Sequence, residues 1–216
     1  MKEQVKEMTT RSYYIPKGGL PQQGESCEDK SRFTSSYLMI DKRSLTDITS
    51  SFLPEWTKTR LWVLARPMSG FAETFSHYVM EVSPGGGSSS PEPDPTAQGV
   101  LFIVGGMGKI EIDGTAHDLV AGSYVYLAPN AAWTFINIGA EPVTFHWIRK
   151  RYQPAAGVDM PTSFVTSDDA VPPSPMPDTN GSWATSRFVA PEDLRHDMHV
   201  NIVSFDPGGH IPFAET

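Results

Sequence analysis

The chain has 216 residues, of which 39% are hydrophobic and 11% aromatic, which is enough apolar material for a packed core. A formal net charge of −8 gives no general attraction for nucleic acid or anionic membranes, so neither is expected as a partner. The single cysteine, Cys27, excludes an internal disulfide and suits a reducing compartment. No stretch has the length and apolarity of a membrane span, and residues 1–11 are too polar for a secretory signal. We therefore expect a soluble, cytoplasmic protein.

The first third of the chain is predicted to be an arm followed by short strands. Residues 1–35 are polar and rich in turn residues, which is typical of an N-terminal arm. Short apolar runs then predict strands at Tyr37–Ile40, Leu61–Ala65 and Phe75–Val82. From Ser83 to Thr96 the composition of Gly, Ser and Pro predicts a loop.

The stretch from Gln98 to Lys150 predicts a nearly complete antiparallel barrel, and the rest of the chain is organised around it. Asp113-Gly114 suits a type I′ hairpin turn, because both central positions of that turn need positive φ. Short β segments recur at regular spacing with almost no helical periodicity between them. These predicted strands are Val100–Val104, Lys109–Ile112, Thr115–Leu119, Tyr124–Leu127, Trp133–Asn137 and Val143–Lys150. The fold class is thus all-β.

The barrel stretch resembles the cupin family of jelly-roll barrels. Cupins carry two short motifs, the first with His-x-His, a Glu and a Gly, the second with a Gly, Pro-x-Gly, a His and an Asn. In the second motif Gly122 and Asn137 match, Ala128-Pro129-Asn130 replaces Pro-x-Gly, and Trp133 stands in the histidine position. In the first motif Gly106 matches, Gly99 takes the Glu position, and Glu92 and Asp94 lie near the two histidine positions.

This barrel has therefore lost the usual metal cage of a cupin. A catalytic transition-metal site needs three or four protein ligands, and Glu92 with Asp94 supplies at most two. Two interpretations of these acids remain open. They could hold a hard cation through water, or they could be exposed charges in a proline-rich loop, and the second is favoured by their neighbours. The basic run Arg149–Arg151 is interpreted as a solvated strand end.

Beyond the barrel, the sequence predicts a linker and the start of a second, related barrel. Residues 36–152 form the first, metal-free barrel, and the proline-rich residues 153–176 form a linker. Trp183–Val189 is similar to Trp56–Trp62, and Val200–Phe205 with its following Pro-Gly-Gly is similar to Val79–Val82 with its own. Two matched blocks in the same order indicate duplication. Residues 177–216 are thus predicted to begin an incomplete second cupin barrel, which makes the architecture bicupin.

The chain also resembles one bicupin family, the (S)-ureidoglycine aminohydrolases, first known as glyoxylate-induced proteins. The resemblance is strongest in Leu61–Phe75, Phe145–Lys150 and Arg195–Val203. It implies a metal-free first barrel and a second barrel that binds Mn²⁺ and hydrolyses ureidoglycine to ureidoglycolate and ammonia in allantoin breakdown. In that family the metal motif begins Glu-Thr-His, so Glu215, followed by Thr216, is the one ligand that the resemblance carries over.

The histidines offer few further candidates. His77 and His146 lie in predicted strands, where a single histidine is usually a structural, hydrogen-bonded residue. His196 and His199 flank a strand start, and their spacing would place them on opposite faces. His210, close to Glu215 in sequence, is the best local candidate for a second metal contact.

Three functions remain open. The first is the N-terminal portion of a manganese-dependent aminohydrolase acting on ureidoglycine, inactive without the rest of its second barrel. The second is a metal-free cupin that serves as a binding or assembly module. The third is a cupin that senses a sugar or small acid through an aromatic pocket formed by Phe102, Tyr124, Tyr126, Trp133 and Phe135. Unpaired strands and the family resemblance both favour a homo-oligomer.

Overall fold

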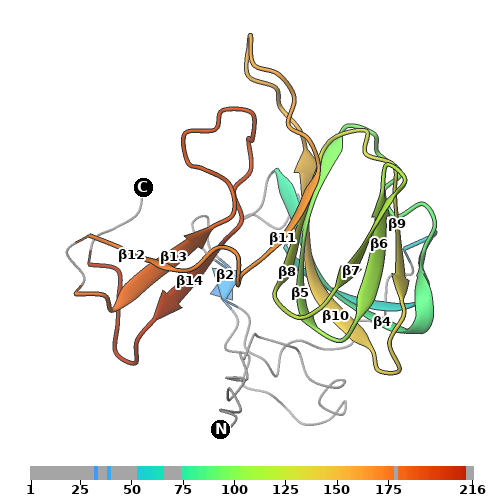
Figure 1. Cartoon of the computed structure of the whole chain (residues 1–216), viewed down its shortest axis with the longest axis horizontal. Helices are drawn as coiled ribbons and strands as arrows, with labels where there is room; N and C mark the ends of the chain where they lie inside the picture. Colours follow the sequence, from blue (N-terminus) through green and yellow to red (C-terminus); the bar gives the residue numbers. More distant parts are fainter. Residues whose placement is uncertain (1–31, 34–37, 40–52, 66–73, 178–179, 213–216) are drawn as a thin grey trace, which may run out of the picture.

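The computed structural model describes residues 32–33, 38–39, 53–65, 74–177 and 180–212. In this part of the chain the ordered elements are fourteen β-strands (Figure 1). The strands are β1 (Arg32–Phe33), β2 (Leu38–Met39), β3 (Thr57–Ala65), β4 (Phe75–Ser88), β5 (Ala97–Gly105), β6 (Gly108–Ile112), β7 (Thr115–Leu119), β8 (Ser123–Leu127), β9 (Trp133–Asn137), β10 (Val143–Arg151), β11 (Phe164–Ser167), β12 (Ser174–Pro175), β13 (Trp183–Arg187) and β14 (Asn201–Phe205). No helix in the described part is long and apolar enough to cross a membrane.

Strands β3 to β11 form the predicted antiparallel barrel. Their order is β11-β8-β5-β10-β4-β9-β6-β7. Strand β3 lies outside this order and pairs with β4. The hairpin between β6 and β7 turns at Asp113 and Gly114, whose φ angles of 49° and 82° are the two positive values that a type I′ turn requires. The all-β cupin-like barrel predicted from the sequence is therefore confirmed, together with most strand positions.

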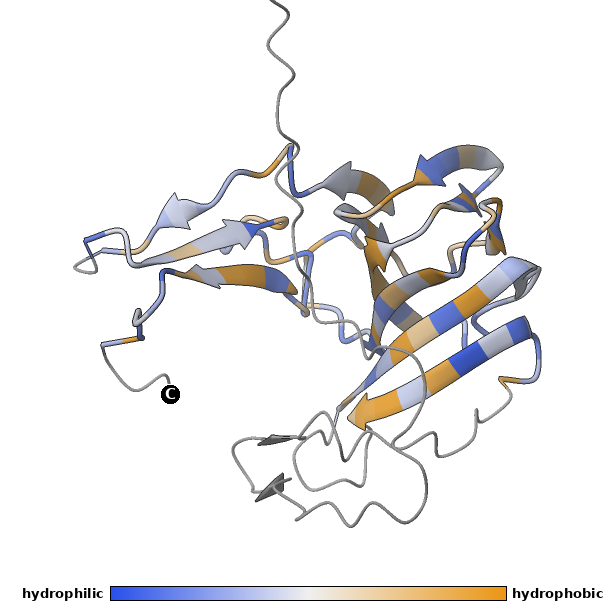
Figure 2. Cartoon of the chain, turned by 90° about the horizontal axis from the view of Figure 1, so that it is seen from below, coloured by the Kyte–Doolittle hydropathy of each residue, from blue (hydrophilic) through white to orange (hydrophobic). Residues whose placement is uncertain are grey.

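Alternating side chains fill the inside of the barrel. Along β5, Leu101 and Ile103 point inward and are fully buried, and they face Phe145 and Trp147 of the paired strand β10. Figure 2 shows the resulting alternation of apolar and polar residues along the barrel strands. The indole of Trp56 lies among these side chains, 5.8 Å from the ring of Trp147. The inside is thus a packed aromatic core.

Strand β4 runs further than predicted. The segment Ser83–Ser88 was expected to be loop, but β4 continues through it and pairs with β9 at Gly87 and Ser88. Glycine makes this possible, because a Cβ on Gly87 would lie 2.0 Å from the carbonyl oxygen of Phe135. The prediction was wrong because these glycines serve close backbone packing and not a turn.

The outer face of the barrel near β5 and β8 is covered by the C-terminal part of the chain. Val100, Phe102 and Val104 point outward from β5 but are almost fully buried. The residues that cover them are Phe188, Met198, Val200 and Ile202. Strand β5 is consequently apolar on both faces, which explains its uninterrupted hydrophobic run.

Strands β12, β13 and β14 form a small sheet of order β12-β13-β14, which lies beside the barrel in Figure 1, and β1 and β2 pair with each other in a separate two-stranded sheet. The segment predicted as a linker supplies β12 to this sheet and β11 to the barrel, where β11 pairs with β8. The two blocks that are similar in sequence also behave alike, since β13 pairs with β14 antiparallel as β3 pairs with β4. Each block begins with a buried tryptophan, Trp56 or Trp183. The proposed duplication and its domain boundaries remain predictions that this likeness supports.

Candidate functional site

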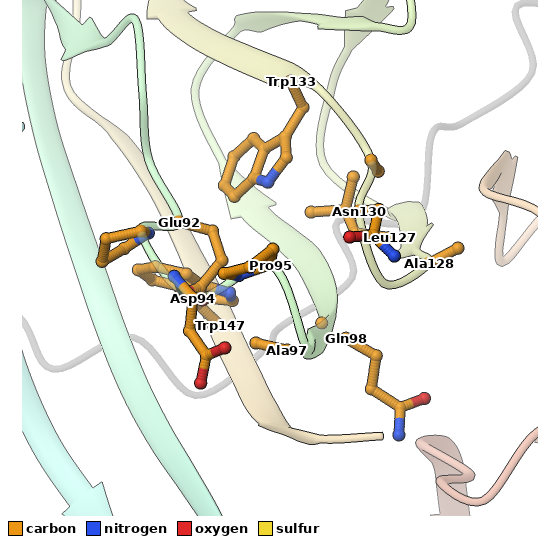
Figure 3. A pocket seen from close by; sticks show the side chains of 13 residues that line it. Glu92, Asp94, Pro95, Ala97, Gln98, Leu127, Ala128, Asn130, Trp133 and Trp147 are labelled. Carbon is orange, nitrogen blue, oxygen red and sulfur yellow. Dashed lines mark hydrogen bonds between the residues drawn. The ribbon is translucent and has the colours of Figure 1, made fainter. Parts of the chain in front are cut away.

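A cavity of about 180 Å³ opens at one end of the barrel (Figure 3). The loop after β4 forms one wall, the first residues of β5 form the floor, and the turn between β8 and β9 forms the opposite wall. Trp133 of β9 and Trp147 of β10 complete the lining. The full lining comprises Glu92, Pro93, Asp94, Pro95, Ala97, Gln98, Gly99, Leu127, Ala128, Asn130, Ala131, Trp133 and Trp147.

The structure brings together the residues that lie at or near the metal-ligand positions of a cupin. Glu92, Asp94, Gly99 and Trp133 are separated by up to 41 positions in sequence, yet all four line this one cavity. Among the described residues, no group of three His, Cys, Asp or Glu side chains could hold a metal ion. The lining of this cavity therefore does not fit manganese.

Aromatic rings occupy the space that a ligand cage would need. The rings of Trp133 and Trp147 lie 5.9 Å apart and are nearly perpendicular, at 83°. At Gly99 a Cβ would lie 3.1 Å from Nε1 of Trp147, so even a small side chain there would crowd the indole. The glycine in the Glu position and the large Trp147 are thus sterically matched. Sequence reasoning missed Trp147 as a cavity residue, because it lies on β10, beyond both motifs, where the sequence gave no signal.

The two acids at the cavity are held by hydrogen bonds. Oε1 of Glu92 accepts from the backbone N–H of Asp94 at 3.0 Å and from the guanidinium of Arg149 at 2.5 Å. Burial raises the pKa of Glu92, and these two donors act against that rise. Asp94 accepts from the hydroxyl and the backbone N–H of Thr96, which lower its pKa. These hydrogen bonds therefore hold Glu92 in the cavity wall, and only Asp94 lies near solvent.

The basic run at the end of β10 forms three ion pairs. Arg149 pairs with Glu92, Lys150 with Asp197 at 3.0 Å, and Arg151 with Asp94 at 3.5 Å. The side chains of Arg149 and Lys150 are only 25% and 15% exposed. The prediction of a solvated strand end therefore holds for Arg151 alone. The pairs of Arg149 and Arg151 neutralise the two acids that line the cavity.

A polar network links the floor of the cavity to the C-terminal segment. Gln98 is 1% exposed, and its amide oxygen accepts from the hydroxyl of Tyr126 at 2.9 Å. Its amide nitrogen donates to Asp197, which also accepts from the backbone N–H of Gln153 at 2.9 Å. Sequence reasoning gave no sign of this network, since its members are up to 99 residues apart.

Two histidines expected to act singly are in fact a pair. Nε2 of His77 on β4 lies 2.8 Å from Nδ1 of His146 on β10. Burial and the neighbouring His146 lower the pKa of His77 to about 4. The expectation that each is a hydrogen-bonded structural residue holds, but the partner of His77 is the other histidine.

The other histidines do not form a site within the described residues. His196 packs edge-on against Tyr126, at 4.5 Å between ring centroids, and burial lowers its pKa. His199 and His210 are exposed. Glu215, the predicted manganese ligand, lies outside the described residues, as does Cys27.

The aromatic pocket expected from five side chains is not formed. Trp133 and Phe135 point into the barrel core, whereas Phe102, Tyr124 and Tyr126 belong to the cluster on the outer face. Tyr124 stacks on Phe188 at 4.0 Å and 11°, so the outer three serve to hold the C-terminal segment. The expectation failed because adjacent strand residues face opposite sides of a sheet.

Comparison with known proteins places the chain in a family. Residues 78–149 match the model of the cupin domain. The chain is similar in structure to the glyoxylate-induced protein from Pseudomonas aeruginosa, with a TM-score of 0.86 and 49% identity over 95% of this chain and 75% of that one. The YlbA protein from Escherichia coli shares the fold with a TM-score of 0.70 at 20% identity, over 85% of this chain and 69% of that one.

Two curated relatives carry an enzyme name. A rice protein (Oryza sativa subsp. japonica) named a probable (S)-ureidoglycine aminohydrolase is 27% identical over 87% of this chain. The (S)-ureidoglycine aminohydrolase of Escherichia coli (strain K12) is 22% identical over 78% of this chain. The chain spans 59% and 63% of the lengths of these two relatives. It therefore belongs to the glyoxylate-induced protein family of cupins, which is related to the (S)-ureidoglycine aminohydrolases.

Proposed function

We propose that this protein takes part in the manganese-dependent hydrolysis of (S)-ureidoglycine to ureidoglycolate and ammonia, in allantoin breakdown. The observation that carries the proposal is that both curated relatives bear the aminohydrolase name and align over most of this chain. The substrate is a small molecule, and the assembly that acts on it is a homo-oligomer.

The chemistry belongs to the second cupin unit and not to the cavity of the first barrel. The first barrel carries Trp133 and Gly99 where ligands would be needed, whereas Glu215 follows the described residues in the second unit. A manganese ion bound with Glu215 would supply Lewis-acid stabilisation of charge as ammonia leaves. One carboxylate is too few to hold the ion, so the remaining ligands must come from other residues.

The test is ammonia release from (S)-ureidoglycine by the protein isolated from its native source, with Mn²⁺ supplied. We expect manganese-dependent release that is abolished by a chelator and restored by the metal. Glu215→Gln should lower activity by about 100-fold or more, because a neutral amide is a poor ligand for a hard cation. Glu141→Gln, which changes an exposed acid between β9 and β10, is the matched control and should leave activity unchanged.

The intact mass of the native protein decides how a negative result is interpreted. A mass well above the 23.7 kDa of this chain means that the assay must use the longer protein. A native mass of 23.7 kDa without ammonia release would refute the enzymatic proposal. The metal-free binding module, which the cavity of the first barrel favours, would then be the better function.

A further inference from the structure

A buried histidine lies in the contact between the barrel and the C-terminal part of the chain. Residues 188–202, here called the covering segment, supply the apolar side chains that cover the outer face of β5 and β8. The side chain of His196 in this segment is only 6% exposed. Its ring packs edge-on against Tyr126 of β8 and Phe164 of β11, at centroid distances of 4.5 and 6.3 Å. His196 is therefore part of the contact itself.

One nitrogen of this ring has no partner. Nδ1 of His196 is buried and forms no hydrogen bond with any of the described residues. Nε2 lies 3.8 Å from Oδ2 of Asp193, which is longer than a hydrogen bond. That carboxylate is already held by Arg195, whose Nε and Nη2 donate to its two oxygens at 2.9 and 2.7 Å. Protonation of the ring would make both nitrogens donors, and the charged N–H at Nδ1 would be buried without an acceptor.

The charges of the covering segment compensate poorly for a proton on this ring. Asp193 and Asp197 favour the protonated form, whereas Arg195 and His199 oppose it. Both acids are shared with other cations, since Asp193 binds Arg195 and Asp197 pairs with Lys150 at 3.0 Å. Burial is the largest influence and lowers the pKa of His196.

The barrel elements packed against the ring add no negative charge. Strands β8, β10 and β11 contain no acidic residue. The hydroxyl of Tyr126 donates to Gln98, and that of Tyr152, just after β10, donates to the carbonyl oxygen of Arg195. A protonated His196 would therefore face neutral rings and the paired Lys150.

We propose that His196 makes the contact between the barrel and the covering segment sensitive to pH, so that protonation of its ring in weak acid releases the segment from the outer face of the barrel. The docked segment excludes a proton that the released segment binds, because the pKa of His196 is lowered from 6.5 in the folded protein. The contact is thus at full strength above pH 6.5 and weakens as the pH falls below it. Release uncovers Tyr124, which stacks on Phe188 of the segment at 4.0 Å.

The test is amide hydrogen exchange of the whole protein at pH 7.5 and 5.5, with each rate divided by the intrinsic rate at that pH. We expect protection of the covering segment and β14 to fall by up to about ten-fold at pH 5.5, the limit for one proton at one unit below 6.5. Protection of β5 and β10 should fall less, because the barrel stays folded.

Variants identify the group that senses the pH. His196→Phe keeps an aromatic ring against Tyr126 but cannot be protonated, so the covering segment should be equally protected at both pH values. His196→Gln tests the same point without an aromatic ring, because weaker packing lowers protection at both pH values but adds no pH dependence. His199→Gln changes an exposed histidine of the same segment and is the matched control, which should keep the full response. His77→Gln should keep it as well, since His77 lies on β4 outside this contact.

Three results would overturn the proposal. Equal protection of the covering segment at both pH values in the unmodified protein would mean that the contact does not respond to pH. A response that persists in His196→Phe and His196→Gln would assign it to another group. An equal loss in β5 and β10 would show global unfolding instead of release. None of these measurements uses ammonia release, so failure here is distinguishable from failure of the proposed enzymatic function.

Discussion

His77 and His146 form the clearest titratable pair among the described residues. They lie on the neighbouring strands β4 and β10, with 2.8 Å between Nε2 and Nδ1. At this distance one ring must donate and the other accept, so the pair requires at least one neutral imidazole. The pKa of His77, lowered to about 4 chiefly by burial, agrees with that requirement.

The pair predicts a loss of stability in weak acid. The folded-state pKa of His77, about 4, lies below its ordinary value of 6.5, so between these values the unfolded chain binds a proton that the fold excludes. The stabilising contribution is thus present above pH 6.5 and lost as the pH falls toward 4. Its size is at most about 3 kcal/mol.

Replacement of His77 by Gln should reduce the loss of stability between pH 6.5 and 4, measured as the free energy of unfolding in urea between pH 7.5 and 4. His117→Gln on β7 is the control, and parallel curves for protein and variant would contradict the assignment.

Among the turns of the barrel, Gly122 has a special role. It lies before β8 with φ at +90°, a conformation that L residues rarely adopt. Its carbonyl oxygen accepts from the backbone N–H of Asp168, just after β11, and a Cβ would lie 2.4 Å from Oδ1 of Asp168. The glycine of the second cupin motif thus lets the end of β11 close against the barrel.

Substitution of this glycine is expected to be costly. In Gly122→Ala the backbone is strained and the new methyl group displaces Asp168. We therefore expect the free energy of unfolding to fall by about 3 kcal/mol or more. Gly114→Ala is a matched control, because Gly114 has a similar φ of +82° and no atom within 4 Å of the added Cβ. It should cost only about 1 kcal/mol. Similar losses in the two variants, measured by chemical denaturation, would show that Asp168 moves aside freely.

The barrel and the small sheet are joined by an apolar contact and a polar one. Phe188, Met198, Val200 and Ile202 cover the outer face of β5 and β8. Beside them, Asp197 binds Gln98, Lys150 and the backbone of Gln153. The two parts should therefore unfold together and not as independent units.

Removal of the Asp197 carboxylate should uncouple them in part. Asp197→Ala loses an ion pair and two further hydrogen bonds, and it leaves the amide of Gln98 without that acceptor, at a cost of about 2 kcal/mol. Amide hydrogen exchange should accelerate in β13 and β14 while β5 and β10 remain protected. Asp193→Ala is the control, because its strongest hydrogen bonds go to the nearby Arg195. Uniform acceleration across both sheets would refute a local connection.

Much of the barrel could be predicted from the sequence because its signals are local. The turn at Asp113-Gly114 and the strands Thr115–Leu119 and Trp133–Asn137 appear in the structure with the predicted bounds. Motif spacing likewise located Glu92 and Trp133, which the structure places at one cavity. The loop predicted for the glycine-rich part of β4 was wrong. Glycines that allow close backbone packing and glycines that form turns cannot be told apart from the sequence pattern alone.

Composition and motif order were sufficient to determine an all-β cupin barrel without the usual metal ligands, since turns and alternating strands depend on residues close together in sequence. Only the tertiary structure showed the histidine pair, the network at Asp197 and the cavity that Glu92 and Trp133 share. Each of these brings together residues 40 or more positions apart in sequence, such as Glu92 and Trp133, or Gln98 and Asp197, which are 99 positions apart. Such contacts follow from strand order and register in the closed barrel, which local periodicity does not specify.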